Sequence, residues 1–333
     1  MAVPSSPAKA YPVSDLRALA RYSAQIGGDP EQVQAAGGNT SVKENGTLWV
    51  KASGLWLADA EDRDLFVPVD VAEVLDAIDA GSEADVKAAT LEDRNPAGLR
   101  PSIETSLHAL LPHRFVIHTH SVRTIAIAIQ ADAEAQFARC LDGLSWVWVP
   151  YTFPGLPLTR AIKDAIGSRP IDIVVMGNHG LVVAGDDLDA TAALVAAVER
   201  RLDGRSLALE PRQAPPRPGL RPVAHGIAHA LADDASLRAM ALAGSYYPDH
   251  VIFLGPAACT PETREPGRNL ILEPGAGAYL PEDATPAADE LARCLALVLA
   301  RVPAGADLVR LTDQEEAALL GWDAEQYRQS LTR

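Results

Sequence analysis

The sequence predicts an α/β protein, because patterns typical of helices and of buried strands alternate along the chain. Residues 13–27 carry apolar side chains at helical spacing, with Ser14 as the expected N-cap. Residues 115–120 and 171–176 are short apolar runs of the kind that forms buried strands. Asn45-Gly46, between two short apolar segments, is a strong hairpin signal.

The remaining elements follow the same alternation. Residues 65–69 predict a strand that leads into a helix at Asp70, whereas residues 81–100 are polar and predict irregular structure. Ser102 is the expected N-cap of a helix over 101–111. Further helices are expected over 121–141, 158–167, 186–201, 225–232, 236–243, 287–301 and from Thr312 to about Leu331. Further strands are expected around Val42, over 48–50, 146–151, 181–185, 250–255 and 269–273.

The chain divides at a proline-rich stretch. Residues 211–222 contain enough prolines to exclude a regular helix or a central strand, so we expect a linker there. Residues 13–210 then form a first, catalytic unit, and residues 223–333 form a smaller α+β extension. Residues 1–12 predict a disordered arm.

Composition limits the possible environments and partners. The 333 residues are 48% apolar, yet no apolar run reaches the roughly 18 residues of a membrane span. The N-terminus lacks the apolar core of a secretory signal, so we expect a cytoplasmic protein. A net charge of −15 argues against nucleic-acid or anionic membrane partners. The cysteines lack CxxC spacing, which predicts reduced core thiols.

Three histidines form a candidate metal site. His118 and His120 end a predicted strand, where residues two apart point to the same side. His179 lies in a glycine-flanked turn between two apolar strands, which is unusual for a core histidine. Three imidazoles leave a divalent ion such as zinc with an open coordination position. The alternative is a set of unrelated core and surface histidines.

Glu104 is the candidate proton acceptor beside this site. An open metal ion can bind a ketone oxygen with an adjacent hydroxyl and stabilise the enediolate that forms when a neighbouring proton leaves. A carboxylate must take that proton. The alternative for Glu104 is a helix-capping carboxylate. His108, one turn later on the same face, either supports the site from behind or, more commonly for such a position, is an ordinary helix histidine. The turns at 37–41 and 51–54 suit an anion or are plain structural turns.

Five motifs, at residues 37–41, 53–54, 101–104, 118–120 and 178–181, together resemble those of the class II aldolase/adducin family, which includes the L-fuculose-phosphate and L-rhamnulose-phosphate aldolases. The similarity spans about residues 14 to 205. The extension, with the motif of residues 247–253, resembles the enlarged form found beside the aldolase part of bifunctional rhamnulose-phosphate aldolase/dehydrogenases, although no GxGxxG follows a strand here. The matching motifs are Gly37-Gly38-Asn39-Thr40-Ser41, Ser53-Gly54, Pro101-Ser102-Ile103-Glu104, His118-Thr119-His120 and Asn178-His179-Gly180-Leu181.

The resemblance implies a three-layer α/β/α fold around a mostly antiparallel sheet. It also implies a homotetramer with a site between subunits, zinc or another divalent metal on the three histidines, and Glu104 as acid/base. A family tyrosine that acts on the aldehyde from a neighbouring subunit matches Tyr151. A further pocket serine of the family falls at Ile103, where this sequence departs. The family's phosphate-binding residues match Asn39, Ser53, Gly54 and Ser102.

Three functions are consistent with these observations. The first is a zinc-dependent aldolase that cleaves a ketose phosphate into dihydroxyacetone phosphate and a short aldehyde. The second keeps the metal and the enediolate but acts as an epimerase, decarboxylase or dehydratase on a sugar acid or sugar phosphate; Ile103 leaves room for such a substrate. The third is a non-catalytic adducin-like binding protein, which would not need the complete ligand set that this sequence keeps.

Overall fold

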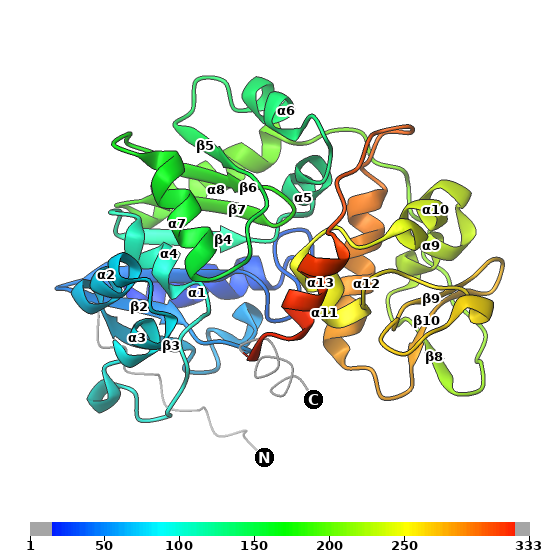
Figure 1. Ribbon diagram of the computed structural model, residues 1–333, viewed down its shortest axis with the longest axis horizontal. Coiled ribbons are helices and arrows are strands. Elements are labelled where there is room, and N and C mark those ends of the chain that lie inside the picture. Colours follow the sequence, from blue (N-terminus) through cyan, green and yellow to red (C-terminus); the bar gives the residue numbers. More distant parts are fainter. Residues whose placement is uncertain (1–14, 324–333) are drawn as a thin grey trace, which may run out of the picture.

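A seven-stranded sheet forms the centre of the first unit in the computed structural model, which describes residues 15–323 (Figure 1). Its strand order is β3-β2-β1-β4-β7-β6-β5, and all neighbours pair antiparallel except β5 and β6. The predicted mostly antiparallel sheet is therefore confirmed. The strands are β1 (Asn39–Glu44), β2 (Thr47–Lys51), β3 (Phe66–Asp70), β4 (Phe115–Thr119), β5 (Trp146–Val149), β6 (Ile173–Met176) and β7 (Gly180–Gly185).

Helices cover both faces of this sheet, which confirms the three-layer architecture. Apolar side chains alternate along each strand, so that Ile117 packs toward one helical layer and Val116 toward the other. One layer consists of α1 (Leu16–Gly27), α5 (Val122–Ala128), α6 (Ala133–Cys140) and α8 (Leu188–Arg201). The other consists of α2 (Val71–Ala80), α4 (Thr105–Leu110) and α7 (Leu156–Ile166), with α3 (Glu83–Ala88) beside α2.

Local sequence signals fix several of these boundaries. Asn45 and Gly46 both adopt positive φ, 51° and 78°, as a two-residue hairpin turn between β1 and β2 requires. Asp70 caps α2 through its carboxylate and the Glu73 N–H, and Asp187 caps α8 in the same way. The expected hairpin and the helix after residue 70 are confirmed.

Residues 220–320 fold into a smaller unit around a second sheet of three antiparallel strands. Its strands are β8 (Leu220–Pro222), β9 (Ile271–Glu273) and β10 (Gly277–Pro281), in the order β8-β10-β9. Its helices are α9 (Ala230–Asp233), α10 (Ala235–Ala243), α11 (Pro248–Leu254), α12 (Pro286–Leu299) and α13 (Asp313–Leu320). Short 3₁₀ turns occur in both units, at Leu57–Asp59 and Glu92–Arg94 in the first and at Gly226–His229 and Pro261–Thr263 in the smaller one. Among the described residues no helix is long and apolar enough to cross a bilayer.

The two units share a buried contact. In Figure 1, α11, α12 and α13 lie between the large sheet and the small one. Val122 and Ile125 of α5 join the apolar core that Leu295 of α12 helps to form. Arg301, just after α12, pairs with Glu31 of the first unit at 2.6 Å. The division into a catalytic unit and an extension stays a prediction, but the extension packs closely on the first unit.

Several expected elements are wrong in type or extent. Residues 250–255 form the end of helix α11 and not a strand, because Pro248 opens a helix that Gly255 ends at a φ of 89°. A short run of buried apolar residues has no periodicity that distinguishes a helix from a strand. Helix α4 begins at Thr105, with Glu104 at the N-cap, so Ser102 is not its cap. Residues 83–88 are helical, and residues 220–222 of the expected linker form an edge strand.

Other expectations concern the ends of the chain. The predicted arm over 1–12, the cap at Ser14 and the last residues of the final helix toward Leu331 lie outside the described residues. The capping box at Thr312 is confirmed, but the helix that it opens ends at Leu320.

Replacing a core leucine tests the layered packing. Leu158 of α7 is 1% exposed in the layer that covers β4 and β6, whereas Leu75 of α2 is 37% exposed. We expect Leu158→Ala to lower the free energy of unfolding by about 2–5 kcal/mol, since it leaves a cavity. The matched control Leu75→Ala should cost about 1 kcal/mol or less. Denaturant unfolding measures both, and equal losses would contradict the assignment of this layer.

Candidate metal centre

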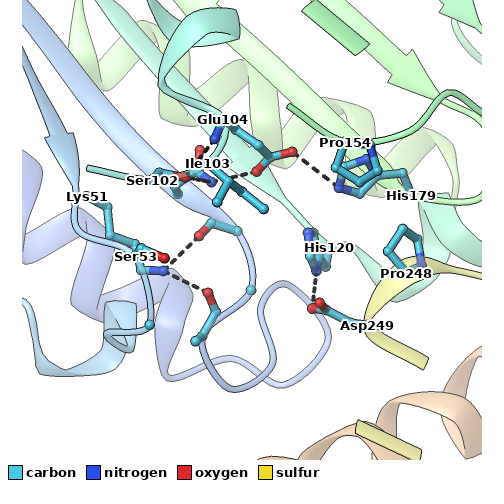
Figure 2. Close-up of a pocket in the computed structure, with 15 residues that line it drawn as sticks. Lys51, Ser53, Ser102, Ile103, Glu104, His120, Pro154, His179, Pro248 and Asp249 are labelled. Atoms are coloured by element: carbon cyan, nitrogen blue, oxygen red, sulfur yellow. Dashed lines mark hydrogen bonds and ion pairs between the residues drawn. The ribbon is translucent and has the colours of Figure 1, made fainter. Parts of the chain in front are cut away.

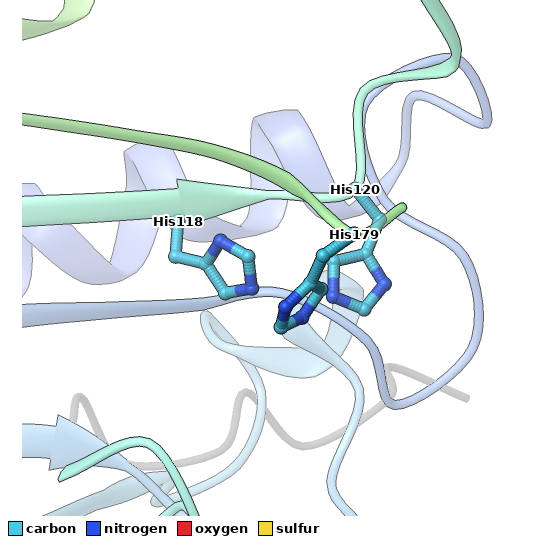
Figure 3. Close-up of side chains that lie close together, drawn as sticks. All are labelled: His118, His120 and His179. Carbon is cyan, nitrogen blue, oxygen red and sulfur yellow. The ribbon is translucent and has the colours of Figure 1, made fainter. Parts of the chain in front are cut away.

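Strand β4, at the centre of the sheet, carries His118 near its C-terminal end, on the face that α4 covers. His118 lies opposite Asn39 of β1 and Val182 of β7 in the ladder. It shares a face with Val116, which packs under α4 and α7. His120 follows directly after the strand, so the two-residue spacing carries both imidazoles to the same side, as Figure 3 shows.

His179 reaches the same place from the turn between β6 and β7. Asn178 before it adopts a positive φ of 52°, a conformation that asparagine tolerates. Gly180 after it leaves no space for a side chain, because a Cβ there would lie 2.4 Å from the Thr119 carbonyl oxygen. This close approach of β7 to β4 brings His179 next to His118 of β4 and to His120 just after it (Figure 3).

The three imidazoles have the arrangement of a metal ligand set. Their ring centroids are 4.9, 5.1 and 5.2 Å apart, and one ligand atom from each lies within 4.8 Å of the others. His118 Nδ1 donates to the Leu181 carbonyl at 2.9 Å, so in the neutral imidazole Nε2 carries the lone pair. The Nε2 atoms of His118 and His120 are buried without a hydrogen-bond partner among the described residues. Buried nitrogens of this kind fit a divalent cation.

Glu104 lies against the histidines at the N-cap of α4. Its two carboxylate oxygens are each 3.3 Å from a histidine Nε2, that of His118 and that of His179. The residue is 5% exposed, and Oε1 has no hydrogen-bond partner among the described residues. Figure 2 shows this carboxylate facing the pocket beside His179. The structure thus brings Glu104, His118, His120 and His179 together, as the sequence predicts.

Burial is the largest influence on the pKa values of these groups. It lowers the pKa of His179 to about 3 and lowers that of His120 against the opposing effect of Asp249. For His118, the Glu104 carboxylate outweighs burial and raises the pKa. Burial raises the pKa of Glu104, but the adjacent histidines outweigh it and hold that pKa well below its ordinary value. At neutral pH, Glu104 is ionised, as a proton acceptor must be.

A chain of hydrogen bonds orients Asn39 toward Glu104. The Ser41 hydroxyl donates to His108 Nδ1 at 2.7 Å, and His108 Nε2 donates to Asn39 Oδ1. The direction of these bonds follows from Asn39, whose Nδ2 donates to Glu104 Oε2 at 2.7 Å and to Ser102 Oγ at 3.1 Å. Its Oδ1 must therefore accept from His108 Nε2, which leaves His108 Nδ1 to accept from Ser41. His108 is therefore not the ordinary helix histidine that the sequence suggested. Its position one turn after Glu104 was the available signal.

The four residues predicted to bind an anion line one pocket. An isolated bridge between Ala52 and Pro101 brings the turn after β2 next to the segment before α4. The pocket has an empty volume of about 430 Å³, counting the part open to solvent. Its walls also include Ile103 and parts of the metal centre (Figure 2). The predicted residues that line it are Asn39, Ser53, Gly54 and Ser102.

Lys51 is a pocket residue that the sequence did not single out. It ends β2, is 2% exposed and donates from Nζ to the carbonyls of Ala36 at 2.8 Å and Gly38 at 3.2 Å. Among the described residues that line the pocket, it is the only lysine or arginine. A charged residue at the end of a predicted buried strand was the signal that could have found it. It places a positive charge beside the predicted anion-binding residues.

Tyr151 is not brought to this pocket. Its ring packs with Phe153 against Val251 and Leu319 of the smaller unit. Its hydroxyl is buried without a hydrogen-bond partner among the described residues, and burial, together with Glu315, raises its pKa. The role expected from the resemblance, action on the aldehyde of a neighbouring subunit, stays a prediction.

Asp249 is the second residue that the sequence did not single out. Its Oδ2 lies 3.0 Å from His120 Nδ1, and its side chain is 3% exposed. It stands in the first turn of α11, so the smaller unit supplies part of the pocket wall, together with Pro248. The expectation of a strand at residues 250–255 hid this placement.

Substitution of Gly180 tests whether the turn geometry serves the metal centre. A Cβ at Gly180 would collide with the Thr119 carbonyl, so Gly180→Ala should displace His179 and reduce bound metal to well below half of the wild-type content. Elemental analysis of purified protein measures this. Gly204→Ala is the control, because its added Cβ meets nothing closer than 3.9 Å. Full metal occupancy in Gly180→Ala would contradict the assignment.

The chain is similar to several known proteins. The chain is 32% identical over 200 residues to the uncharacterized oxidoreductase YuxG of Bacillus subtilis (strain 168), a match that covers 54% of this chain but only 28% of that protein. It resembles the N-terminal class II aldolase domain of a conserved protein from Thermoplasma acidophilum, with 29% identity, a TM-score of 0.48, and coverage of 61% of this chain and 100% of that one.

It also resembles the L-fuculose-1-phosphate aldolase from Thermus thermophilus, with 16% identity, a TM-score of 0.38, and coverage of 56% and 92% of the two chains. The profile of the class II aldolase and adducin N-terminal domain matches residues 17–203. This match covers more than half of the chain and includes the three histidines and Glu104. The protein therefore belongs to the class II aldolase/adducin family.

Proposed function

We propose that the protein is a metal-dependent aldolase that reversibly cleaves a ketose phosphate into dihydroxyacetone phosphate and a short aldehyde. The observation that carries this proposal is the close approach of three buried imidazoles and the Glu104 carboxylate to one another. A scaffold protein has no need of such a set, since burying four ionisable groups together costs stability. The completeness of the set therefore favours catalysis over an adducin-like binding role.

His118, His120 and His179 would hold the cation, with zinc the first expectation for a set of imidazole ligands. When bound, a divalent cation polarises the substrate carbonyl and stabilises the negative charge that develops on its oxygen. The protein contributes orientation: the Leu181 carbonyl fixes the ring of His118, and the turn at Gly180 fixes that of His179.

Glu104 would move the proton. In the direction of condensation, its carboxylate takes a proton from the carbon beside the ketone carbonyl. That carbon then bonds to the aldehyde carbon, the aldehyde C=O π bond opens, and the aldehyde oxygen takes up a proton to become a hydroxyl. In the direction of cleavage, this hydroxyl loses its proton and re-forms the aldehyde carbonyl as the carbon–carbon bond breaks, and Glu104 returns a proton to the carbon beside the ketone carbonyl. Asn39 Nδ2 donates to Glu104 Oε2, which leaves Oε1 facing the pocket for this transfer.

The pocket supports an anionic substrate. Asn39, Ser53 and Ser102 supply short polar side chains, and Lys51 supplies a positive charge beside them. Ile103 stands where the family has a serine, so one hydroxyl donor is missing from the expected phosphate site. We propose that the charge of Lys51 compensates for this hydroxyl and that a phosphorylated or carboxylated sugar is bound.

A related reaction is the second candidate. Epimerases, decarboxylases and dehydratases on the same metal would use the same proton acceptor, and Ile103 favours an altered substrate. Product analysis on a panel of sugar phosphates and sugar acids separates these reactions from aldol cleavage. We also propose a cytoplasmic homotetramer, for which the mass of the purified protein in solution is the test.

Removal of one histidine tests the metal site. We expect about one zinc ion per chain in the wild type and near-complete loss of metal and of activity in His179→Ala, because the remaining imidazoles hold the ion weakly. Elemental analysis after gel filtration measures this. His225→Ala is the control, since His225 pairs with Glu290 in the smaller unit, away from the pocket. Equal metal content in wild type and His179→Ala would contradict the site.

Replacement of the carboxylate tests the proton transfer separately. Glu104→Gln should keep its fold but lower turnover by about 10²–10⁴-fold, because the amide cannot accept the proton. Exchange of the carbon-bound proton of dihydroxyacetone phosphate in deuterated water, followed by NMR, measures the step itself. Glu316→Gln is the matched control, a buried glutamate bonded to Ser245 outside the pocket. Undiminished exchange in Glu104→Gln would contradict its role.

A further inference from the structure

The smaller unit reaches into the metal centre through one side chain. Asp249 Oδ2 lies 3.0 Å from His120 Nδ1, and Figure 2 shows the carboxylate directed at that ring from the start of α11. Both side chains are almost completely buried, at 3% and 8% exposure. This contact crosses from residues outside the matched family region to a residue inside it.

This contact determines which nitrogen of His120 is available. A neutral imidazole carries one proton, and the carboxylate of Asp249 can only accept a hydrogen bond when ionised. Nδ1 therefore holds the proton, and Nε2, which has no hydrogen-bond partner among the described residues, keeps its lone pair. In His118, the Leu181 carbonyl accepts from Nδ1 in the same way. Asp249 and this carbonyl thus both hold the Nδ1 proton of a histidine and leave the lone pair on its Nε2.

The loop of residues 34–38 packs against Asp249 and His120 from the other side. A Cβ at Gly37 would lie 2.7 Å from His120 Nδ1 and 2.9 Å from Asp249 Oδ2. Only glycine allows the loop to pass this close to the pair. Gln34 of the same loop donates from Nε2 to the His120 carbonyl at 3.3 Å. His120 is thus fixed through its ring by one unit and through its backbone by the other.

The position of Asp249 depends on the packing of the smaller unit. All residues of α11 are buried, and the helix packs against α12 and α13. Asn178, next to His179, donates from Nδ2 to the Tyr246 carbonyl at 2.8 Å and the Val309 carbonyl at 2.9 Å. The segment before α11 therefore also holds the turn that carries the third histidine.

We propose that Asp249 is a positioning residue of the metal centre, so that the smaller unit sets the metal affinity of a site whose ligands all come from the first unit. The proposal rests on the proposed metal site but not on the identity of the reaction. It predicts that loss of the carboxylate weakens the bound ion, because a ligand histidine without its partner is less basic and less well oriented.

Metal affinity of the full-length protein tests this directly. We would measure the dissociation constants of Zn²⁺ and Co²⁺ by competition with a chelator, and the visible absorption spectrum of the Co²⁺ form, for Asp249→Asn and Asp249→Ala. Asp289→Asn and Asp289→Ala are matched controls, because Asp289 is another buried aspartate of the same unit, 7% exposed and paired with Arg221.

We expect Asp249→Ala to weaken both metals by about 10–100-fold and to alter the cobalt spectrum, with a smaller loss in Asp249→Asn, whose amide oxygen can still accept from Nδ1. The Asp289 variants should bind as the wild type does. Thermal unfolding of the metal-free proteins shows whether each variant is folded. If Asp249→Ala does not fold, the isosteric Asp249→Asn decides by the same measurements.

Affinities within twofold of the wild type, with an unchanged cobalt spectrum, would overturn the proposal. Loss of the fold even in Asp249→Asn would also overturn it, since the carboxylate would then serve the fold. A wild-type protein that binds neither metal would refute the proposed metal site itself. Weaker binding in the Asp249 variants, with no aldol cleavage by the wild type, would support the role of Asp249 and refute only the proposed reaction.

Discussion

The site depends on one constraint, the removal from water of the polar groups that gather at the C-terminal end of β4. Three imidazoles, two carboxylates, an amide and an ammonium group are buried in or directly beside one pocket. Each such group costs free energy unless it finds a partner. The surrounding structure supplies these partners as a set of directed hydrogen bonds: a strand carbonyl for His118, a helix histidine for Asn39 and loop carbonyls for Lys51.

This constraint explains why the pocket is built from so many elements. Polar side chains come together from β1, from the end of β4 and from the turn after β6. The N-cap of α4 places Glu104 against them. The smaller unit then closes the remaining side with α11. A polar cluster left without this cover would be open to water, and the electrostatic interactions among its groups would be weaker.

The sequence alone predicted the residues whose signals are local. The two-residue spacing of His118 and His120 follows from strand geometry, and the glycine-flanked His179 stood out in a turn. Five motifs in order identified the fold. Asp249 could not be found in this way, because its partner is distant in the chain and a short apolar run does not distinguish a helix from a strand. Lys51 looked like the end of a hairpin strand, and only the bridge between Ala52 and Pro101 reveals where it lies.

The separation of these contacts along the chain has a consequence for how the protein is made. Asn178 bonds to a carbonyl 131 residues later, and Glu31 pairs with a partner 270 residues away. Contacts of this range form late, because the entropy of closing the intervening chain must be overcome first. During translation the histidines emerge well before α11, so the first unit can fold while His120 still lacks its carboxylate. The centre is therefore completed only after α11 and the helices that pack against it have been made and have docked on the first unit.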